Sequence, residues 1–284
     1  MKKIILFTML SLLSTGLLAY SDADMDGVAD SVDKCPNTPL MDLVDINGCT
    51  KKKLNVSHTK SNSHADIIVG ANYSGSNFAS LNQTDTYSSS LQVDYYYKDF
   101  SLQASTSYYK TDGHAYSENG MNDTFVGAAY NIKLTKYLLV RVGAGASLPT
   151  YKTSLNNNNT DYTGSLNVSY ALAKTNIFAG YSYTLNNDDD VSVKDSLGNV
   201  YDYRYQDTNA YSAGMGYYLT NSLYMSAAYN QSNSIYKGYE DVKTASLYGY
   251  KSIDKNWFMT FFYAYGLSNT ASDHAASIKL GYYF

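Results

Sequence analysis

A short acidic stretch near the amino terminus carries the residue types and spacing that could bind a metal ion. Within residues 22–33, aspartates recur at alternate or nearly alternate positions, and Gly27 stands at the sixth position, where the loop must turn sharply. A hard cation such as Ca²⁺ takes six or more oxygen ligands, and alternate residues of one tight loop can all point oxygens inward. Without a cation, five carboxylates this close together would repel one another. The spacing therefore predicts a Ca²⁺ site with these ligands: Asp22, Asp24, Asp26, Val28 through its carbonyl, Asp30 and Asp33.

The last position of this loop departs from the usual pattern. It holds Asp33, which is one carbon shorter than the Glu that such loops carry there. The shorter side chain makes bidentate coordination less assured. A solvated acidic spacer that binds nothing specific is therefore the alternative interpretation of residues 22–33.

The residues before this loop have the pattern of a secretory signal peptide. After Met1, residues 1–21 carry two lysines, continue with an apolar run from Ile4 to about Leu18, and end with the small residues Ala19 and Ser21. Cleavage after Ala19 or after Ser21 would fit. The alternative, a membrane anchor, fits less well because the apolar run is short for a helical span.

Export bears on the two cysteines, Cys35 and Cys49. In an oxidising compartment a disulfide between them is the expected state. It would close a loop of about 15 residues and stabilise the fold by roughly 3 kcal/mol in the chain-entropy model. Two free thiols or a metal-binding pair are the alternatives.

The run DADMDGVADSVDKCPNTP, followed by VDINGC, resembles a thrombospondin type 3 repeat of the kind found in OmpA-like bacterial surface proteins. The resemblance covers about 28 residues of the segment 22–50. It implies that the five aspartates bind calcium and that the two cysteines pair. This chain carries one copy and a fragment around Asp42 and Asp45, whereas members of the family usually hold several copies in series.

Residues 51–62 connect this segment to the rest of the chain. They contain four lysines and no apolar periodicity, which is typical of a solvated linker. A role for the lysines in holding anionic surfaces is the alternative.

From residue 63 onward, apolar and polar residues alternate with a period of two, as in strands that face two different environments. In residues 137–149, for example, Val140 and Val142 alternate with Arg141 and Gly143. Five connections are tight turns and six are longer loops rich in Asn, Asp, Ser and Gly, an asymmetry typical of outer-membrane barrels. The segments expected to be strands are 64–75, 86–97, 100–110, 123–134, 137–149, 162–173, 176–186, 208–219, 222–233, 242–253, 256–268 and 274–284.

The pattern thus predicts an all-β fold for residues 63–284, a twelve-stranded antiparallel transmembrane β-barrel in the lipid of the bacterial outer membrane, with the amino-terminal segment in the periplasm. A soluble β-sandwich is the alternative, but it would not explain the unequal connections.

The composition supports this fold and excludes other classes. The chain has 284 residues, of which 32 are Tyr, and a mean hydropathy of −0.33. So many aromatic residues are incompatible with disorder, and past the signal peptide no apolar run is long enough for a helical span. With 21 basic and 25 acidic residues, the chain has no positive field for nucleic acid. The tyrosines are expected to form two belts at the membrane interfaces.

The barrel interior is predicted to be lined mainly by small residues, Gly, Ser, Asn, Thr and Ala, that leave open space. Five charged residues fall at the alternate positions that are expected to face inward, in the half of the barrel nearer the short turns: Asp66, Asp94, Lys133, Arg141 and Lys279. They could form a constriction with weak selectivity or a salt-bridge network that seals the barrel. Arg141 is the strongest candidate for a constriction residue, and a structural partnership with Asp66 or Asp94 is its alternative role.

The carboxy terminus has the alternation of a closing strand. Leu280, Tyr282 and Phe284 share one face, and a terminal Phe in this pattern resembles the signal read by the barrel assembly machinery. Outward apolar residues would also be needed simply to face lipid.

The predicted function is that of a passive, porin-like channel for small polar solutes, in an oligomeric state that the sequence leaves open. The alternative is a structural or adhesion barrel that acts through its outer loops, above all the acidic loop 186–207. Catalysis is not predicted. His114 and His274 lie near aspartates at the outer rim, but no motif adds a nucleophile or a second acidic pair.

Overall fold

The computed structural model describes residue 34 and the ranges 63–77, 83–113, 117–150, 159–194 and 200–284. The chain divides into two units, residues 1–60 and 61–284, and the second is a β-barrel. The predicted calcium ligands between Asp22 and Asp33, both cysteines and the linker 51–62 lie outside the described residues. The predictions made for them therefore stay predictions.

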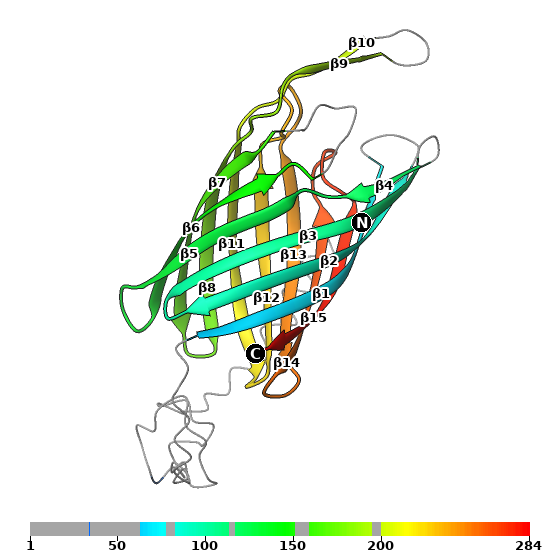
Figure 1. Cartoon of the computed structure of the whole chain (residues 1–284). Helices are drawn as coiled ribbons and strands as arrows, with labels where there is room; N and C mark the ends of the chain where they lie inside the picture. The colour runs from blue at the N-terminus through cyan, green and yellow to red at the C-terminus, as the bar shows by residue number, and fades with distance from the viewer. Residues whose placement is uncertain (1–33, 35–62, 78–82, 114–116, 151–158, 195–199) are drawn as a thin grey trace, which may run out of the picture. The chain divides into compact units, whose positions relative to one another are not determined.

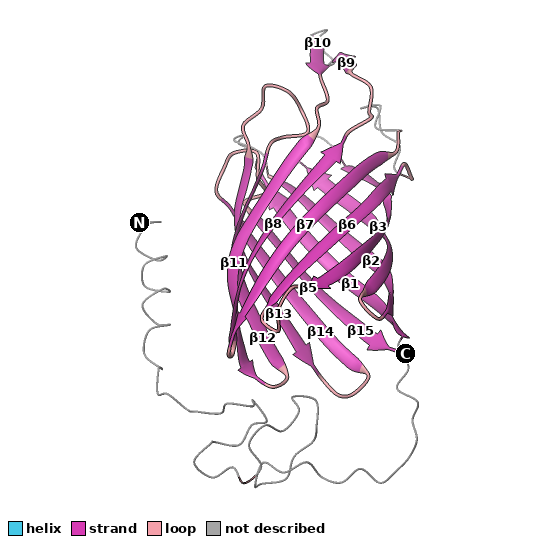
Figure 2. Ribbon diagram, turned by 90° about the vertical axis from the view of Figure 1, so that its left-hand side faces the viewer, coloured by secondary structure: helices cyan, strands magenta, loops and turns pink. Residues whose placement is uncertain are grey.

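Within the described residues, thirteen strands form one antiparallel sheet that closes on itself through the pairing of β2 with β3. Strands β4 and β5 both pair with β3 and share one position, so the barrel has twelve strand positions, as the sequence predicted (Figures 1 and 2). The barrel strands are β1 (Ser63–Ser76), β2 (Thr84–Tyr97), β3 (Phe100–Gly113), β4 (Ser117–Met121), β5 (Thr124–Lys133), β6 (Leu138–Leu148), β7 (Asp161–Leu172), β8 (Thr175–Leu185), β11 (Thr208–Thr220), β12 (Leu223–Ser232), β13 (Val242–Ser252), β14 (Trp257–Gly266) and β15 (His274–Tyr283).

The five predicted tight turns are all present, at one end of the barrel (Figure 2). Two of them place non-glycine residues in the left-handed region, Lys98 with φ 54° and Ala173 with φ 53°. Positive φ is what the primed turns of tight hairpins require, because their twist matches that of the strands. The short connections therefore set the register of β2 with β3 and of β7 with β8.

Alternate residues of each strand face opposite sides of the barrel wall, as the period of two predicted. Val69, Leu91 and Leu102, on three neighbouring strands, are all about half exposed on the outer face. On the inner face, Asp66 and Asp94 are 5% and 6% exposed. An apolar outside and a polar inside are the arrangement of a barrel that sits in lipid. In the part of the chain that the structure describes, no helix is long and apolar enough to cross a bilayer.

The expectation that the tyrosines form two outer belts is correct only for part of them. Tyr87, Tyr162 and Tyr211, among others, are more than half exposed on the outer face. A second set faces inward and lines the smaller of two interior cavities together with Asp66 and Asp94: Tyr96, Tyr248, Tyr250 and Tyr283. Runs such as Tyr-Tyr-Tyr at 95–97 necessarily place rings on both faces of a strand.

The outer loops contain structure that the alternation did not predict. Strands β9 (Val191–Lys194) and β10 (Val200–Tyr203) form a hairpin beyond the barrel wall, at the end opposite the tight turns (Figures 1 and 2). Behind this hairpin, Tyr205 pairs with Tyr236 of the loop after β12, and Asp190 accepts a hydrogen bond from the Tyr205 backbone N at 2.9 Å. Tyr205 is 6% exposed, and this burial raises the pKa of its hydroxyl. The acidic loop 186–207 is thus packed against its neighbour rather than wholly solvated.

Candidate channel lumen

Two carboxylates lie side by side on the inner wall near the short-turn end. Asp66 on β1 and Asp94 on β2 are register partners, which places like charges directly opposite each other. Asp94 accepts a hydrogen bond from Gln92 Nε2 at 2.8 Å, whereas Asp66 Oδ1 is buried without a hydrogen-bond partner. The nearest basic group to Asp66 Oδ1 is His64 Nε2, at 4.0 Å, and it is charged only when protonated. Among the described residues, neither carboxylate therefore forms an ion pair with a lysine or an arginine.

Arg141 lies on β6, and neutral groups hold its side chain. Its Nη2 donates to Ser101 Oγ at 2.9 Å, and its Nη1 donates to Asn131 Oδ1 at 3.4 Å. The ion pairs formed by the described residues include none between Arg141 and either aspartate. Of its two predicted roles, the structural partnership with Asp66 or Asp94 is therefore not formed as a direct ion pair.

The structure does not bring Lys133 together with the other four charged residues. Lys133 is the last residue of β5, its side chain is 70% exposed, and its Nζ lies 2.7 Å from Asp99 Oδ1 in the β2–β3 turn. This ion pair thus connects the end of β5 to the β2–β3 turn, at the end of the barrel that carries the tight turns.

Lys279 projects across the inner wall from β15. Its register partner on β1 is Gly70, and a Cβ added at Gly70 would lie 2.6 Å from Lys279 Cγ. Glycine at position 70 therefore leaves the space that the aliphatic stem of Lys279 occupies. Among the described residues, no hydrogen bond or ion pair holds the Lys279 amine.

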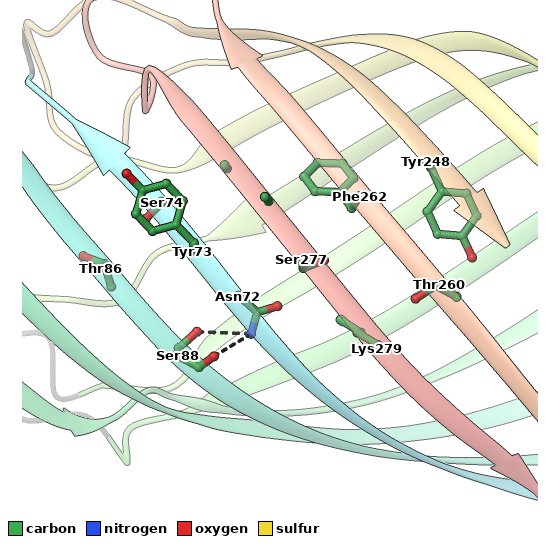
Figure 3. A pocket seen from close by; sticks show the side chains of 12 residues that line it. Asn72, Tyr73, Ser74, Thr86, Ser88, Tyr248, Thr260, Phe262, Ser277 and Lys279 are labelled. Carbon is green, nitrogen blue, oxygen red and sulfur yellow. Dashed lines mark hydrogen bonds between the residues drawn. The ribbon is translucent and has the colours of Figure 1, made fainter.

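Two cavities adjoin inside the barrel. One has a volume of about 420 Å³ and is lined by polar groups that include Asn72 and Ser88, whose side chains are hydrogen-bonded at 3.1 Å (Figure 3). The other has a volume of about 320 Å³ and lies toward the short turns. Three residues line both cavities and mark where they meet: Tyr248, Thr260 and Lys279. The residues of the smaller cavity that carry charge are Asp66, Asp94 and Lys279.

An aromatic cluster forms part of the wall of the smaller cavity, and the sequence reasoning missed it. The hydroxyls of Tyr250 and Tyr283 are 2.7 Å apart, and the Phe258 ring lies 5.6 Å and 4.5 Å from their respective ring centroids. The His64 and Tyr96 rings stack 4.5 Å apart. The available signal is that these residues fall at alternate positions that face inward.

The prediction that small inward residues leave open space is wrong at several glycines. A Cβ at Gly127 would lie 2.8 Å from the Phe125 ring, so this ring already occupies the space above the glycine. Phe178 covers Gly214 and Phe258 covers Gly281 in the same way. Aromatic rings and polar side chains together therefore narrow the lumen.

The residues of the predicted assembly signal share the outer face, as expected. Leu280 and Phe284 are 39% and 67% exposed, and the Tyr282 ring lies 4.8 Å from both Trp257 and Phe284. The backbone N of Phe284 donates to the Ala65 carbonyl at 2.8 Å, which extends the seam between the last and first strands. Recognition of these residues by an assembly machinery stays a prediction.

Of the two histidines expected at the outer rim, the structure describes His274. His274 Nδ1 is 2.8 Å from the Tyr263 hydroxyl, and Asp273 accepts a hydrogen bond from the backbone N of Asn77 at 3.1 Å. His114 lies outside the described residues.

These features define a class: a closed, twelve-stranded antiparallel β-barrel with an apolar outer face, the architecture of bacterial outer-membrane proteins. The NanC porin has a similar fold, with a TM-score of 0.50 and 16% sequence identity over 77% of this chain and 98% of that one. The translocator domain of the autotransporter NalP from Neisseria meningitidis gives a TM-score of 0.49 and 12% identity over 80% of this chain and 90% of that one.

Sequence matches cover only small parts of this chain. No family model matches it. A stretch of 59 residues is 46% identical to Outer membrane porin F of Pseudomonas aeruginosa, over 16% of this chain and 17% of that protein. A stretch of 36 residues is 53% identical to an alpha-agarase of Alteromonas agarilytica, over 13% of this chain and 2% of that protein. The chain thus spans less than a fifth of the length of these relatives.

Proposed function

We propose that the barrel is a passive channel for small polar solutes across the outer membrane. The observation that carries this proposal is the pair of adjoining cavities, of about 420 Å³ and 320 Å³, inside the closed wall. Polar side chains line part of each cavity, and the two cavities meet at Tyr248, Thr260 and Lys279.

The number of strands supports this proposal. Barrels of eight strands are filled by their own side chains, and barrels of about sixteen leave an aqueous channel. Twelve strand positions give an intermediate width, which the inward rings reduce further. The expected activity is therefore the passage of small solutes, with no access for large ones.

A pair of neighbouring positions on β15 provides a test. Ser277 lines the larger cavity, whereas Ile278 is 53% exposed on the outer face. In a liposome swelling assay with a small sugar, Ser277→Trp is expected to slow solute entry several-fold because the indole fills the lumen. Ile278→Trp adds the same group on the lipid side and is expected to leave entry unchanged. Absence of swelling with the folded wild-type protein would contradict the channel.

We also infer that residues 22–33 bind Ca²⁺ and that Cys35 and Cys49 form a disulfide, so that the segment keeps a fixed shape in the periplasm. The support is the ligand spacing in the sequence and the repeat that it resembles.

Calorimetry on the full chain tests the calcium site. The wild-type protein is expected to bind Ca²⁺, and the double substitution Asp24→Asn with Asp26→Asn is expected to abolish that binding because two ligand charges are lost. Asp189→Asn, in an exposed part of the outer loop, is the control for calcium held by the barrel. Equal binding by the wild type and the double variant would reject the site.

A further inference from the structure

The smaller cavity presents opposite charges that are not paired with each other. Asp66 and Asp94 stand on one side, on β1 and β2, and Lys279 reaches the same cavity from β15. The ion pairs of the described residues include none between Lys279 and either aspartate. The charges are therefore separated across a space rather than neutralised by direct contact.

The Asp66 carboxylate has unused hydrogen-bonding capacity. It is 5% exposed, and its Oδ1 has no hydrogen-bond partner. A buried carboxylate oxygen without a donor is costly, because burial removes the water that would solvate it. The nearest group of possible positive charge, His64 Nε2, is 4.0 Å away, beyond hydrogen-bond length. A cationic group that enters the cavity would therefore meet a carboxylate oxygen that no hydrogen bond already occupies.

Aromatic rings line this cavity together with the two aspartates, among them Tyr96 and Tyr283. The ring of His64, next to Asp66, stacks on Tyr96 at 4.5 Å and lies 6.2 Å from Tyr283. Tyr faces attract organic cations through the ring quadrupole, in addition to the attraction of the carboxylates. An ammonium group between the two aspartates would thus meet both kinds of interaction.

The size of the cavity suits a small solute. At about 320 Å³ it lies at the lower end of the range of roughly 300–1,000 Å³ seen for small-molecule sites.

We propose that this cavity is a binding site for a small zwitterion, with its ammonium group at Asp66 and Asp94 and its carboxylate at Lys279. The proposal deepens the proposed channel function and rests on it, because the solute reaches the cavity through the lumen. A simple cation would be repelled by Lys279, and a simple anion by the two aspartates. Arg141, held by Ser101 and Asn131, does not line this cavity.

Calorimetry on the full chain in detergent tests the site with two probes, glycine betaine and choline. Both carry a quaternary ammonium group, and only betaine has a carboxylate. The wild type is expected to bind betaine more tightly than choline. Asp94→Asn is expected to weaken the binding of both about tenfold or more, because each loses a charge partner.

Lys279→Met gives the decisive comparison, since it removes one charge and keeps the aliphatic stem. Betaine is expected to bind about tenfold more weakly or worse, and choline equally well or more tightly. Lys279→Gln is expected to have the same effects, weaker betaine binding and unchanged or tighter choline binding. It replaces the Met variant if that variant does not fold. Asp189→Asn is the control and should leave both affinities unchanged.

The proposal is overturned if wild-type protein binds neither probe, or if a folded Lys279 variant loses betaine and choline equally. Conductance is also recorded in a planar bilayer without added ligand. This second measurement distinguishes a failure of the zwitterion site from a failure of the channel. Conductance without betaine binding rejects the zwitterion site alone. Betaine binding without conductance rejects the channel and leaves the site in place.

Discussion

Glycines beneath aromatic rings recur along the inner face of the barrel. The rings of Phe125, Phe178 and Phe258 each lie over a glycine, where any larger side chain would collide with the ring. Such pairs fill the inner layer of the wall tightly. At the residue scale, the glycines therefore contribute to packing, not to the width of the lumen.

Gly145 offers a test of this packing. A Cβ there would collide with the Phe125 ring and lie 2.9 Å from the Val126 carbonyl oxygen. Gly145→Ala is therefore expected to lower the free energy of unfolding by about 1–3 kcal/mol, measured by urea titration of the protein in lipid.

A matched glycine on the outer face provides the control. A Cβ at Gly164 would have nothing within 4 Å, so Gly164→Ala is expected to be neutral or to stabilise by up to about 1 kcal/mol. Combining Gly145→Ala with Phe125→Leu should recover part of the loss, because the smaller side chain relieves the collision. Equal effects of the two alanine substitutions would contradict this account.

The charged residues show what the sequence can and cannot say about single positions. The period of two assigns Asp66, Asp94, Arg141 and Lys279 to the inner face, and three of them, Asp66, Asp94 and Lys279, line the smaller cavity. It could not predict their partners. The neutral partners of Arg141, for example, come from β3 and β5, and their approach depends on side-chain conformations that alternation does not encode.

At the scale of elements, the tight turn between β13 and β14 shows how a short connection is held. Asp254 Oδ1 accepts hydrogen bonds from the backbone N of Asn256 and of Trp257, both at 2.8 Å. These two donors, with a smaller contribution from Lys255, lower the pKa of the Asp254 carboxyl. The charged carboxylate is thus the form that the folded turn favours.

This lowered pKa predicts a pH-dependent contribution to stability. Asp254 in the folded state has a lower pKa than in the unfolded chain, so its contribution is complete above the unfolded value of about 3.9 and is lost as the pH falls through the folded value. Asp254→Ala is expected to reduce stability in urea at pH 7, and the difference from wild type should shrink in acid.

Asp254→Asn is the control for this prediction, because its amide oxygen can still accept a backbone hydrogen bond. It should lose less stability than the alanine variant. A difference between wild type and Asp254→Ala that persists unchanged into acid would show that the charge is not involved.

The elements that alternation failed to predict are the short ones, β4, β9 and β10. Strand β4, with the sequence SENGM, has no apolar period, and Asn122 and Asp123 separate it from β5. The backbone N of Asn122 nevertheless donates a hydrogen bond to the Ser107 carbonyl at 2.8 Å. This bond holds the connection between β4 and β5 against β3, so both strands pair with the same neighbour. Backbone pairing with a neighbour, rather than side-chain pattern, extends the wall here.

At the scale of the whole molecule, closure of the barrel creates the candidate site. The smaller cavity takes residues from β1, β2, β13, β14 and β15, and these strands surround it only because β1 pairs with β15. The sequence predicted the number of strand positions and the two faces, since both follow from local alternation and turn residues. The cavity itself follows from long-range pairing and from ring packing, and so it could not be predicted.

The central claim is that the barrel interior conducts, and single-channel recording of the purified full chain in a planar bilayer tests it most directly. Tyr248 lines both cavities where they meet, and its neighbour Leu247 is 40% exposed on the outer face. We predict discrete conductance steps that grow with KCl concentration, larger steps for Tyr248→Ala, and unchanged steps for Leu247→Ala. Folded protein that gives no steps, with or without the Tyr248 side chain, would contradict the channel.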